Sequence, residues 1–296
     1  MTKINGIIPI MPAPLTEAGA IDEVSVNNII SFYIEKGVEA LWLLGSAGEE
    51  LSLSRRQTKD LIKSVEKSSN SQIKIITGSG LNNVDDALDF SRELSNLKLD
   101  GFHFLYRDAK QGEKLVIKNI LRLADGCPFP LWLYNNVKRG ATLTRSVIRA
   151  VKNHPNIHGV KYGSFNHGPF LEVCTEQTEN FQVVTAGNFL LSMLVYGGSA
   201  STNSDSNYLF EEYNEIIKLF NQGKLEEARE QQFKLVRLTS ELPKDNNGEN
   251  TARVKFGMSL RGLCSDSMSN SYETLNQYQK SQMIDVLKKY SISWIK

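Results

Sequence analysis

Short apolar segments alternate with amphipathic segments along about the first 222 residues of the chain. A short apolar run bounded by turn residues is typical of a buried strand, whereas apolar positions three and four apart are typical of a helix. The pattern therefore predicts strands that alternate with helices. Eight strands are expected, at residues 6–11, 40–44, 73–77, 101–106, 130–134, 158–161, 181–185 and 199–203.

Residues that cap helices precede several of the amphipathic segments. Asp22, Asn83 and Thr144 each stand before a helical apolar pattern, and their side-chain oxygens can accept hydrogen bonds from the first N–H groups of a helix. Ser54 and Gln57 have the spacing of a capping box, in which each side chain bonds the other residue's N–H group. These signals predict helix starts between the strands.

Repeated strand–helix units imply a parallel sheet and therefore the α/β class. Eight such units can close into a (β/α)8 TIM barrel, for which 296 residues suffice. An open doubly wound sheet is the competing architecture. It is disfavoured because no glycine-rich dinucleotide-binding sequence follows the first predicted strand.

The pattern becomes helical only from about residue 207, over 207–221, 225–241, 250–263 and 273–290. The first of these helices would complete the eighth strand–helix unit. We therefore expect a barrel at residues 1–222 and a C-terminal helical extension at residues 223–296, packed on the barrel.

The composition is that of an ordinary soluble globular protein, with 41% hydrophobic and 23% charged residues. A net charge of +1 gives no basis for binding nucleic acid or an anionic membrane surface. No apolar run approaches the roughly 18 residues of a membrane-spanning helix. Cys127, Cys174 and Cys264 have no metal-ligand spacing, and neither do the four histidines. We expect a cytoplasmic protein with reduced cysteines and with neither a metal nor a cofactor.

Polar residues at three predicted strand ends carry the candidate chemistry. Lys161 ends the sixth strand, Tyr134 ends the fifth, and a glycine-rich turn at residues 45–48 follows the second. Burial lowers the pKa of a lysine, and a neutral amine can attack a carbonyl to form a Schiff base. Taken singly, the three are ordinarily a solvated lysine, a core tyrosine and a tight turn. Their convergence on one face of a barrel therefore carries the hypothesis.

Five short motifs follow one another along the chain. They are Gly6-Ile7-Ile8-Pro9-Ile10-Met11, Gly45-Ser46-Ala47-Gly48-Glu49, Tyr134-Asn135-Asn136, Gly159-Val160-Lys161 and Gly187-Asn188. In this order they resemble the dihydrodipicolinate synthase / N-acetylneuraminate lyase family of pyruvate-dependent lyases that form a Schiff base. The resemblance covers about the first 210 residues and, more loosely, the helical tail.

The resemblance implies catalytic roles for four residues. Lys161 would condense with the keto group of pyruvate, and Tyr134 would relay protons as a general acid and base. Ser46 would hydrogen-bond Tyr134. Tyr106 is the best match to a tyrosine that family members lend to a neighbouring subunit's site.

The resemblance also implies a substrate-binding set. Backbone N–H groups of the turn that contains Gly45, Ala47 and Gly48 would hold the keto-acid carboxylate. Gly187 and Asn203 stand at further family positions, and we expect Glu49 to brace the turn.

Arg139 follows Tyr134 at about the place where the synthase branch binds its second substrate's carboxylate. A guanidinium suits that task, but a solvated basic loop explains Arg139 equally well. Other positions depart from the family pattern: Ala47 lacks a hydroxyl, Val137 replaces a proline, Tyr162 stands where an acid is common, Ala200 replaces a glycine, and Asn203 replaces a serine.

We expect a lyase that condenses pyruvate with an aldehyde, as the synthase branch does, and Arg139 is the reason. Aldol cleavage of a sugar acid or a sialic-acid-like substrate to pyruvate is the alternative within the same chemistry. A barrel that binds a keto acid without turning it over is the alternative outside enzymes. Because family members are commonly tetrameric, the resemblance implies a homo-oligomer, either a dimer or a tetramer, that takes a small-molecule keto acid.

Overall fold

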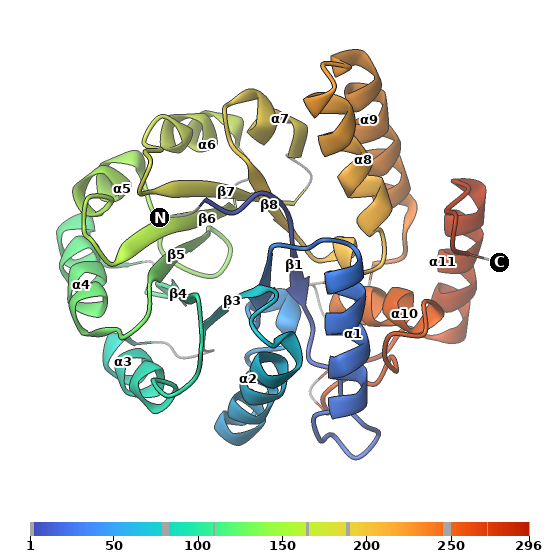
Figure 1. The fold of residues 1–296 in the computed structure, drawn as a ribbon, viewed down its shortest axis with the longest axis horizontal. Coiled ribbons are helices and arrows are strands. Elements are labelled where there is room, and N and C mark those ends of the chain that lie inside the picture. Colours follow the sequence, from blue (N-terminus) through green and yellow to red (C-terminus); the bar gives the residue numbers. More distant parts are fainter. Residues whose placement is uncertain are drawn as a thin grey trace.

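Eight parallel strands form a closed barrel with helices around it (Figure 1). The computed structural model describes residues 3–78, 83–108, 110–163, 166–187, 190–244, 250–270 and 272–295. Asn188, part of the last motif, lies outside these residues. The strands neighbour one another in chain order, and β1 pairs with β8 to close the barrel. The predicted (β/α)8 TIM barrel with a C-terminal helical extension is confirmed.

All eight predicted strands are present. They are β1 (Gly6–Met11), β2 (Ala40–Leu43), β3 (Lys74–Gly78), β4 (Gly101–Leu105), β5 (Leu131–Asn136), β6 (Ile157–Gly163), β7 (Gln182–Ala186) and β8 (Ala200–Asn203). β5 and β6 run two residues further than predicted, because Asn135 and Asn136 pair with Tyr162 and Gly163. Tyr134 and Lys161 therefore lie within paired strands, opposite each other, rather than at their last residues.

Helices and two short 3₁₀ turns connect the strands. They are α1 (Glu23–Glu35), η1 (Ser46–Gly48), α2 (Arg55–Ser69), α3 (Val84–Glu93), α4 (Glu113–Gly126), α5 (Arg145–Val151), α6 (His167–Cys174), α7 (Leu190–Val195), η2 (Asp205–Asn207) and α8 (Phe210–Asn221). The predicted caps are confirmed: Asp22, Asn83 and Thr144 each accept hydrogen bonds from the first turn of a helix. Ser54 and Gln57 form a capping box at the start of α2.

Alternate strand residues belong to two separate cores. Since successive side chains of a strand point to opposite faces, one set fills the barrel and the other contacts the helices. Trp42, Leu105, Trp132 and Tyr134 belong to the inner core. Phe102, Phe104 and Tyr106 of the β4 segment belong to the outer core instead. A residue's position in this alternation decides whether it can reach the barrel mouth.

The helical extension comprises α9 (Leu225–Glu241), α10 (Thr251–Leu260) and α11 (Gln277–Lys289). α9 packs against α8 (Figure 1), and α11 contacts α9. α10 differs from both because it is buried along most of its length and contacts η2. The predicted boundary between residues 222 and 223 falls between α8 and α9 and stays a prediction.

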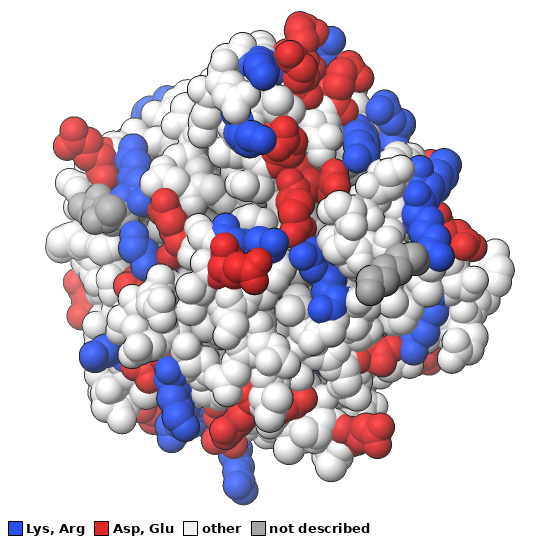
Figure 2. All heavy atoms as spheres, turned by 45° about the vertical axis from the view of Figure 1, so that its right-hand side comes forward, with Lys and Arg blue, Asp and Glu red and all other residues white. Residues whose placement is uncertain are grey.

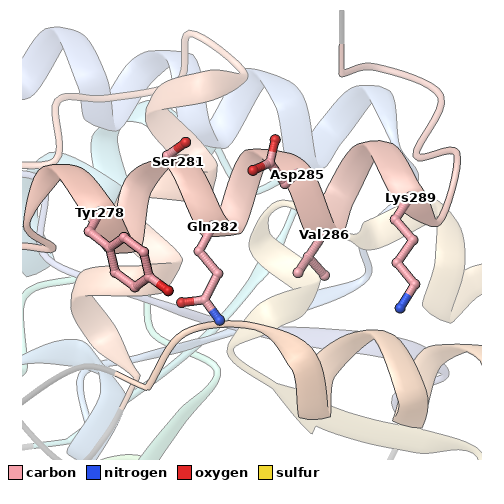
Figure 3. Close-up of a pocket in the computed structure, with 6 residues that line it drawn as sticks. All are labelled: Tyr278, Ser281, Gln282, Asp285, Val286 and Lys289. Carbon is pink, nitrogen blue, oxygen red and sulfur yellow. The ribbon is translucent and has the colours of Figure 1, made fainter.

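Acidic and basic residues are interspersed over the face shown in Figure 2, in keeping with the net charge of +1. A shallow pocket of about 260 Å³ lies along α11, where Tyr278, Gln282 and Val286 point to the same side of the helix (Figure 3). All of its lining residues come from α11, so it has no part in the barrel mouth. Within the described ranges, no helix is long and apolar enough to cross a membrane.

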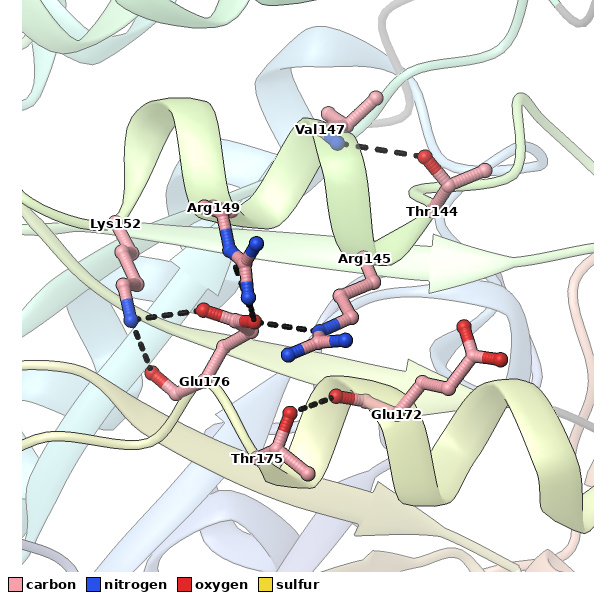
Figure 4. Close-up of polar contacts among 8 residues, drawn as sticks. All are labelled: Thr144, Arg145, Val147, Arg149, Lys152, Glu172, Thr175 and Glu176. Carbon is pink, nitrogen blue, oxygen red and sulfur yellow. Dashed lines mark hydrogen bonds and ion pairs between the residues drawn. The ribbon is translucent and has the colours of Figure 1, made fainter.

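Three cations converge on one carboxylate between α5 and α6 (Figure 4). Arg145 Nε and Arg149 Nη2 donate to Glu176 Oε1 at 2.6 and 2.9 Å, and Lys152 Nζ donates to Oε2 at 2.8 Å. The hydrogen bond from Lys152 and then that from Arg149 lower the pKa of Glu176 to about 2. The cluster joins α5 to the end of α6 and stabilises the barrel's outer layer.

Glu176→Gln should lower the thermal unfolding midpoint at pH 7 by several degrees, because it leaves three cations without their shared anion. A carboxylate with a depressed pKa contributes stability above its unfolded pKa and loses it as the pH falls toward the folded value. The difference in midpoint from the wild type should therefore narrow between pH 5 and pH 3 in calorimetric scans. Glu179→Gln, at an exposed position, is the control. An equal difference in unfolding midpoint at pH 5 and pH 3 would contradict the lowered pKa of Glu176.

Candidate active site at the barrel mouth

Lys161 lies inside the barrel near the carboxyl end of β6, with 1% of its surface exposed. It is in register with Tyr134 on one side and Val184 on the other, and both belong to the inner core. Its Nζ lies 4.7 Å from the ring centre of Trp42 and 4.3 Å from that of Tyr134. The predicted nucleophile is therefore a buried amine enclosed by aromatic rings.

His103 packs against both of these aromatic rings. It stacks on Trp42, with ring centres 4.5 Å apart, and meets Tyr134 edge-on. Burial lowers the pKa of His103 to about 3, and the charges of Lys161 and Arg107 lower it further. Its Nε2 lies 3.0 Å from the Leu43 carbonyl oxygen. Because a carbonyl only accepts, the neutral ring carries its proton on Nε2.

The Tyr134 hydroxyl accepts a hydrogen bond from Asn136 Nδ2 at 3.4 Å. Ser46 does not contact it as predicted: Ser46 Oγ is buried and has no hydrogen-bond partner among the residues that the structure describes. The predicted Ser46–Tyr134 hydrogen bond is therefore wrong for this state of the protein. The strand-end residue Asn136 lies close to the hydroxyl instead, two positions along β5.

The turn after β2 is strained. Leu44 and Glu49 have φ of 69° and 60°, in the left-handed region that non-glycine residues rarely adopt, and Gly45 between them has φ of 91°. The Gly45 N–H donates to Glu50 Oε2 at 3.0 Å, and the Gly48 N–H donates to the Gly45 oxygen at 2.9 Å. The N–H groups of Gly45 and Gly48 thus already donate to acceptors within the chain. The predicted carboxylate site is therefore restricted to the other N–H groups of the turn.

Two donors of this turn remain available. The N–H groups of Ser46 and Ala47 have no acceptor within the described part of the chain. The unpartnered Ser46 hydroxyl stands beside them, and a buried hydroxyl without a partner is costly unless a ligand or water satisfies it. The turn thus keeps two backbone donors and one hydroxyl for an anion.

Sequence reasoning missed Arg107. It follows β4, and its Nη2 lies 2.6 Å from Oε1 of Glu50, a buried residue. Burial raises the pKa of Glu50, while the charges of Arg107 and Lys161 oppose that rise. The strand alternation could have identified Arg107, because it shares the face of His103 and Leu105.

Tyr106 does not reach the site. Its hydroxyl donates to Gln111 and accepts from Asn119 Nδ2 at 2.6 Å, and its ring packs against Phe104 in the outer core. Within its own chain, Tyr106 therefore packs in the outer core, apart from Lys161. Its role in a neighbouring subunit's site stays a prediction.

A cleft of about 860 Å³ opens at the barrel mouth. Tyr134, Gly187 and Asn203 line it, as do Val236 and Thr239 of α9 and Arg253 of α10. A Cβ added to Gly187 would meet no atom within 4 Å, so this glycine leaves the cleft open. The helical extension therefore supplies part of the wall.

Arg139 lies half-buried in the turn after β5, where its N–H donates to the Asn136 oxygen at 2.9 Å. Among the described lining residues of the cleft, this turn contributes Lys138 and not Arg139. The binding role of Arg139 stays a prediction.

Two departures from the family pattern lie away from the mouth. Tyr162 alternates with Lys161, so it faces outward and stacks on Phe170. Ala200 pairs with Gly6 at the opposite, amino-terminal end of the barrel. Tyr162 therefore lies in the outer core, and Ala200 lies in the inner core at the end of the barrel opposite the mouth.

Comparison with other sequences identifies a family and several relatives that are named as synthases. The model of the Dihydrodipicolinate synthetase family matches residues 3–290. The 4-hydroxy-tetrahydrodipicolinate synthase of Geobacter sp. (strain M21) is 25% identical over 278 residues, which are 93% of this chain and 94% of that protein. The enzyme of the same name from Methanosphaerula palustris is 25% identical over 295 residues, covering 97% of this chain and 99% of its own.

Solved structures share the fold at lower identity. YagE, a prophage protein of the dihydrodipicolinic acid synthase family from E. coli K12 solved in complex with pyruvate, superposes with a TM-score of 0.90 at 20% identity, over 98% of this chain and 100% of that one. The N-acetylneuraminate lyase of Proteus mirabilis gives 0.88 at 20% identity, over 98% and 99%.

His103 should stay neutral well into the acid range, because its buried ring would have to carry an uncompensated charge beside Lys161 and Arg107. Nitrogen NMR of histidine-labelled protein should show one ring that does not titrate between pH 8 and pH 4 and is protonated on Nε2. His103→Gln should remove that signal. A titration of this ring near pH 6.5 would contradict the assignment.

Proposed function

The chain belongs to the dihydrodipicolinate synthetase family, and on that premise we propose that it is a lyase that forms a Schiff base between Lys161 and pyruvate. The enamine that follows would condense with an aldehyde, as the name of its sequence relatives suggests. The observation that carries the proposal is the buried Lys161 amine directly opposite Tyr134, inside the barrel and near its mouth. A lysine in such surroundings is suited to covalent catalysis.

The reaction begins with attack of Lys161 Nζ on the keto carbon. Water leaves, and the iminium that forms withdraws electrons from the neighbouring methyl carbon. Loss of a methyl proton gives the enamine, whose carbon bonds to the aldehyde carbon while the aldehyde oxygen takes up a proton. Water then cleaves the iminium, which releases the 4-hydroxy-2-oxo acid and restores the amine.

Tyr134 is the residue that we propose moves these protons. Its ring lies 4.3 Å from Lys161 Nζ, and its side chain lines the cleft from which substrates would enter. Asn136 Nδ2, 3.4 Å from the hydroxyl, orients it. A tyrosine hydroxyl can donate and accept a proton in turn, as the two halves of the reaction require.

The keto-acid carboxylate would lie on the turn after β2. Two backbone donors, from Ser46 and Ala47, and the Ser46 hydroxyl lack partners among the described residues, so a carboxylate there would satisfy all three. Such donors bind an anion well in a buried site, where water does not compete. We propose that the keto group then reaches Lys161, because Gly45 of this turn lies against Trp42 and Tyr134, the rings around the amine.

A second substrate fits in the cleft. A volume of about 860 Å³ exceeds what pyruvate alone would fill. We propose that the aldehyde binds between Tyr134 and the wall that contains Gly187 and Asn203. Arg139, next to the lining residue Lys138, would bind its carboxylate.

Two other functions use the same residues. Aldol cleavage of a sugar acid to pyruvate is the reverse of the same carbon–carbon step, and the same cleft would hold the sugar chain. Binding of a keto acid without turnover requires only the turn and the cleft. The cytoplasmic location and the homo-oligomer, dimer or tetramer, stay predictions.

Incubation with pyruvate and borohydride should add a reduced pyruvate adduct to Lys161, detected by mass spectrometry of its peptide. Lys161→Ala should abolish the adduct, because Lys161 carries the amine that lies against Trp42 and Tyr134. Lys118→Ala, an exposed lysine of α4, is the matched control and should react like the wild type. A wild-type protein that forms no adduct under saturating pyruvate would overturn the proposed chemistry.

Tyr134→Phe should still form the pyruvate adduct but turn over about 10²- to 10⁴-fold more slowly, the usual worth of a general acid–base group. Tyr278→Phe, at a residue of α11 that is 78% exposed, is the matched variant. It should leave both turnover and the unfolding midpoint unchanged, because its side chain is mostly in solvent. Pyruvate consumption and thermal unfolding measure the two effects. Similar loss of turnover in both variants would contradict the separate placement of the tyrosines.

A further inference from the structure

Two consecutive buried carboxylates follow the strained turn and bind cations from different parts of the chain. Glu49 pairs with Lys255 of α10, and Glu50 pairs with Arg107 after β4. The two residues are adjacent, yet their partners come from segments far apart in sequence. The turn at residues 45–48 is therefore held on two sides.

The pair on the Glu49 side is fully enclosed. Neither Glu49 nor Lys255 has exposed surface. Glu49 Oε2 accepts the Ser269 N–H at 2.9 Å, and Lys255 Nζ donates to the Ser267 oxygen at 2.6 Å. The helical extension thus contacts the turn through charged groups that no solvent reaches. Thr251 of the same helix also donates to the Ala47 oxygen, at 3.4 Å.

The Glu50–Arg107 pair holds Gly45, the first residue of the turn, through a hydrogen bond to Glu50. One Glu50 oxygen accepts the Gly45 N–H at 3.0 Å, and the other accepts Arg107 Nη2 at 2.6 Å. A Cβ on Gly45 would approach Trp42 Nε1 to 3.4 Å and Tyr134 Cε1 to 3.8 Å, so this residue lies against the rings around Lys161. Glu50 and Arg107 therefore fix where the turn meets the enclosure.

A turn with this backbone needs external support. Leu44 and Glu49, neither of them glycine, both occupy the left-handed region. Strain of this kind persists only where the surroundings over-determine the conformation. Buried ion pairs are a poor means of general stabilisation, because apolar residues of similar volume often serve as well or better. Four charged groups around one short turn therefore indicate that the turn must keep one particular backbone geometry.

We propose that the Glu49–Lys255 and Glu50–Arg107 pairs form a clamp that keeps the Ser46 and Ala47 donors available to the keto-acid carboxylate. The inference rests on the proposed function and names four positioning residues of its site. None of the four bonds the reacting atoms. Their effect is on the recognition of the carboxylate, through the shape of the turn.

The clamp separates recognition of the carboxylate from reactivity of the amine. Pyruvate should depend on the turn, whereas pyruvamide, its neutral amide, presents the same keto group without the anion. Borohydride trapping at Lys161 over a range of concentrations measures both compounds in one assay. Breaking the clamp should raise the concentration for half-maximal trapping of pyruvate about tenfold or more. The value for pyruvamide should stay nearly unchanged.

The variants test each pair with its own control. Lys255→Met leaves Glu49 buried without a cation, so the double variant Glu49→Gln with Lys255→Met removes both charges and protects folding. On the other side, Arg107→Met should impair pyruvate trapping, and Arg107→Lys should restore part of it. Glu176→Gln removes a buried carboxylate far from the turn in sequence and should change neither compound's trapping. Thermal unfolding confirms that each variant is folded.

The outcomes discriminate between the two proposals. A wild-type chain that forms no adduct with pyruvate would overturn the proposed function and the clamp with it. The clamp alone would be overturned if the wild type forms the adduct and the folded clamp variants need the same pyruvate concentration for half-maximal trapping. Equal losses for pyruvate and pyruvamide would also overturn it, because they would show a general structural effect. A loss confined to pyruvate supports the clamp.

Discussion

The alternation of side chains along closed strands is the constraint on which the site depends. A barrel has no free edge, so the register of every strand is fixed by two neighbours. Lys161, Tyr134 and Trp42 fall on the inner face through this register, and there the aromatic rings exclude water from the amine. A slip of one residue in β6 would place Lys161 among the outer helices and Tyr162 in the barrel.

Much of this arrangement was accessible from the sequence. The apolar runs predicted eight strands because each is buried on both faces, and the caps predicted helix starts because they depend on residues within one turn. Lys161 and Tyr134 were identified because each stands in a short motif near the end of an apolar run. Local signals of this kind depend only on neighbouring residues. They sufficed for the architecture and for the two residues at the centre of the candidate site.

The rest of the site depends on contacts between distant segments. Glu50 and Arg107 lie 57 positions apart, and the Ser269 N–H that binds Glu49 lies 220 positions away, so no local pattern reveals either contact. Tyr106 packs in the outer core of its own chain, and its contribution to a neighbouring subunit's site stays a prediction. The predicted Ser46–Tyr134 hydrogen bond was wrong for another reason, because the direction of the Ser46 hydroxyl depends on the conformation of the turn.

The position of α10 in the chain has a consequence for the order in which a working site arises. Ribosomes make the turn after β2 early, whereas Lys255 and Ser269 belong to the last fifth of the chain. A nascent barrel can close its strands around Lys161 before those residues emerge. Its turn then lacks one of its two supports. If the clamp proposed above is correct, carboxylate recognition is completed only after Ser269 has been made, which is later than the enclosure of the amine.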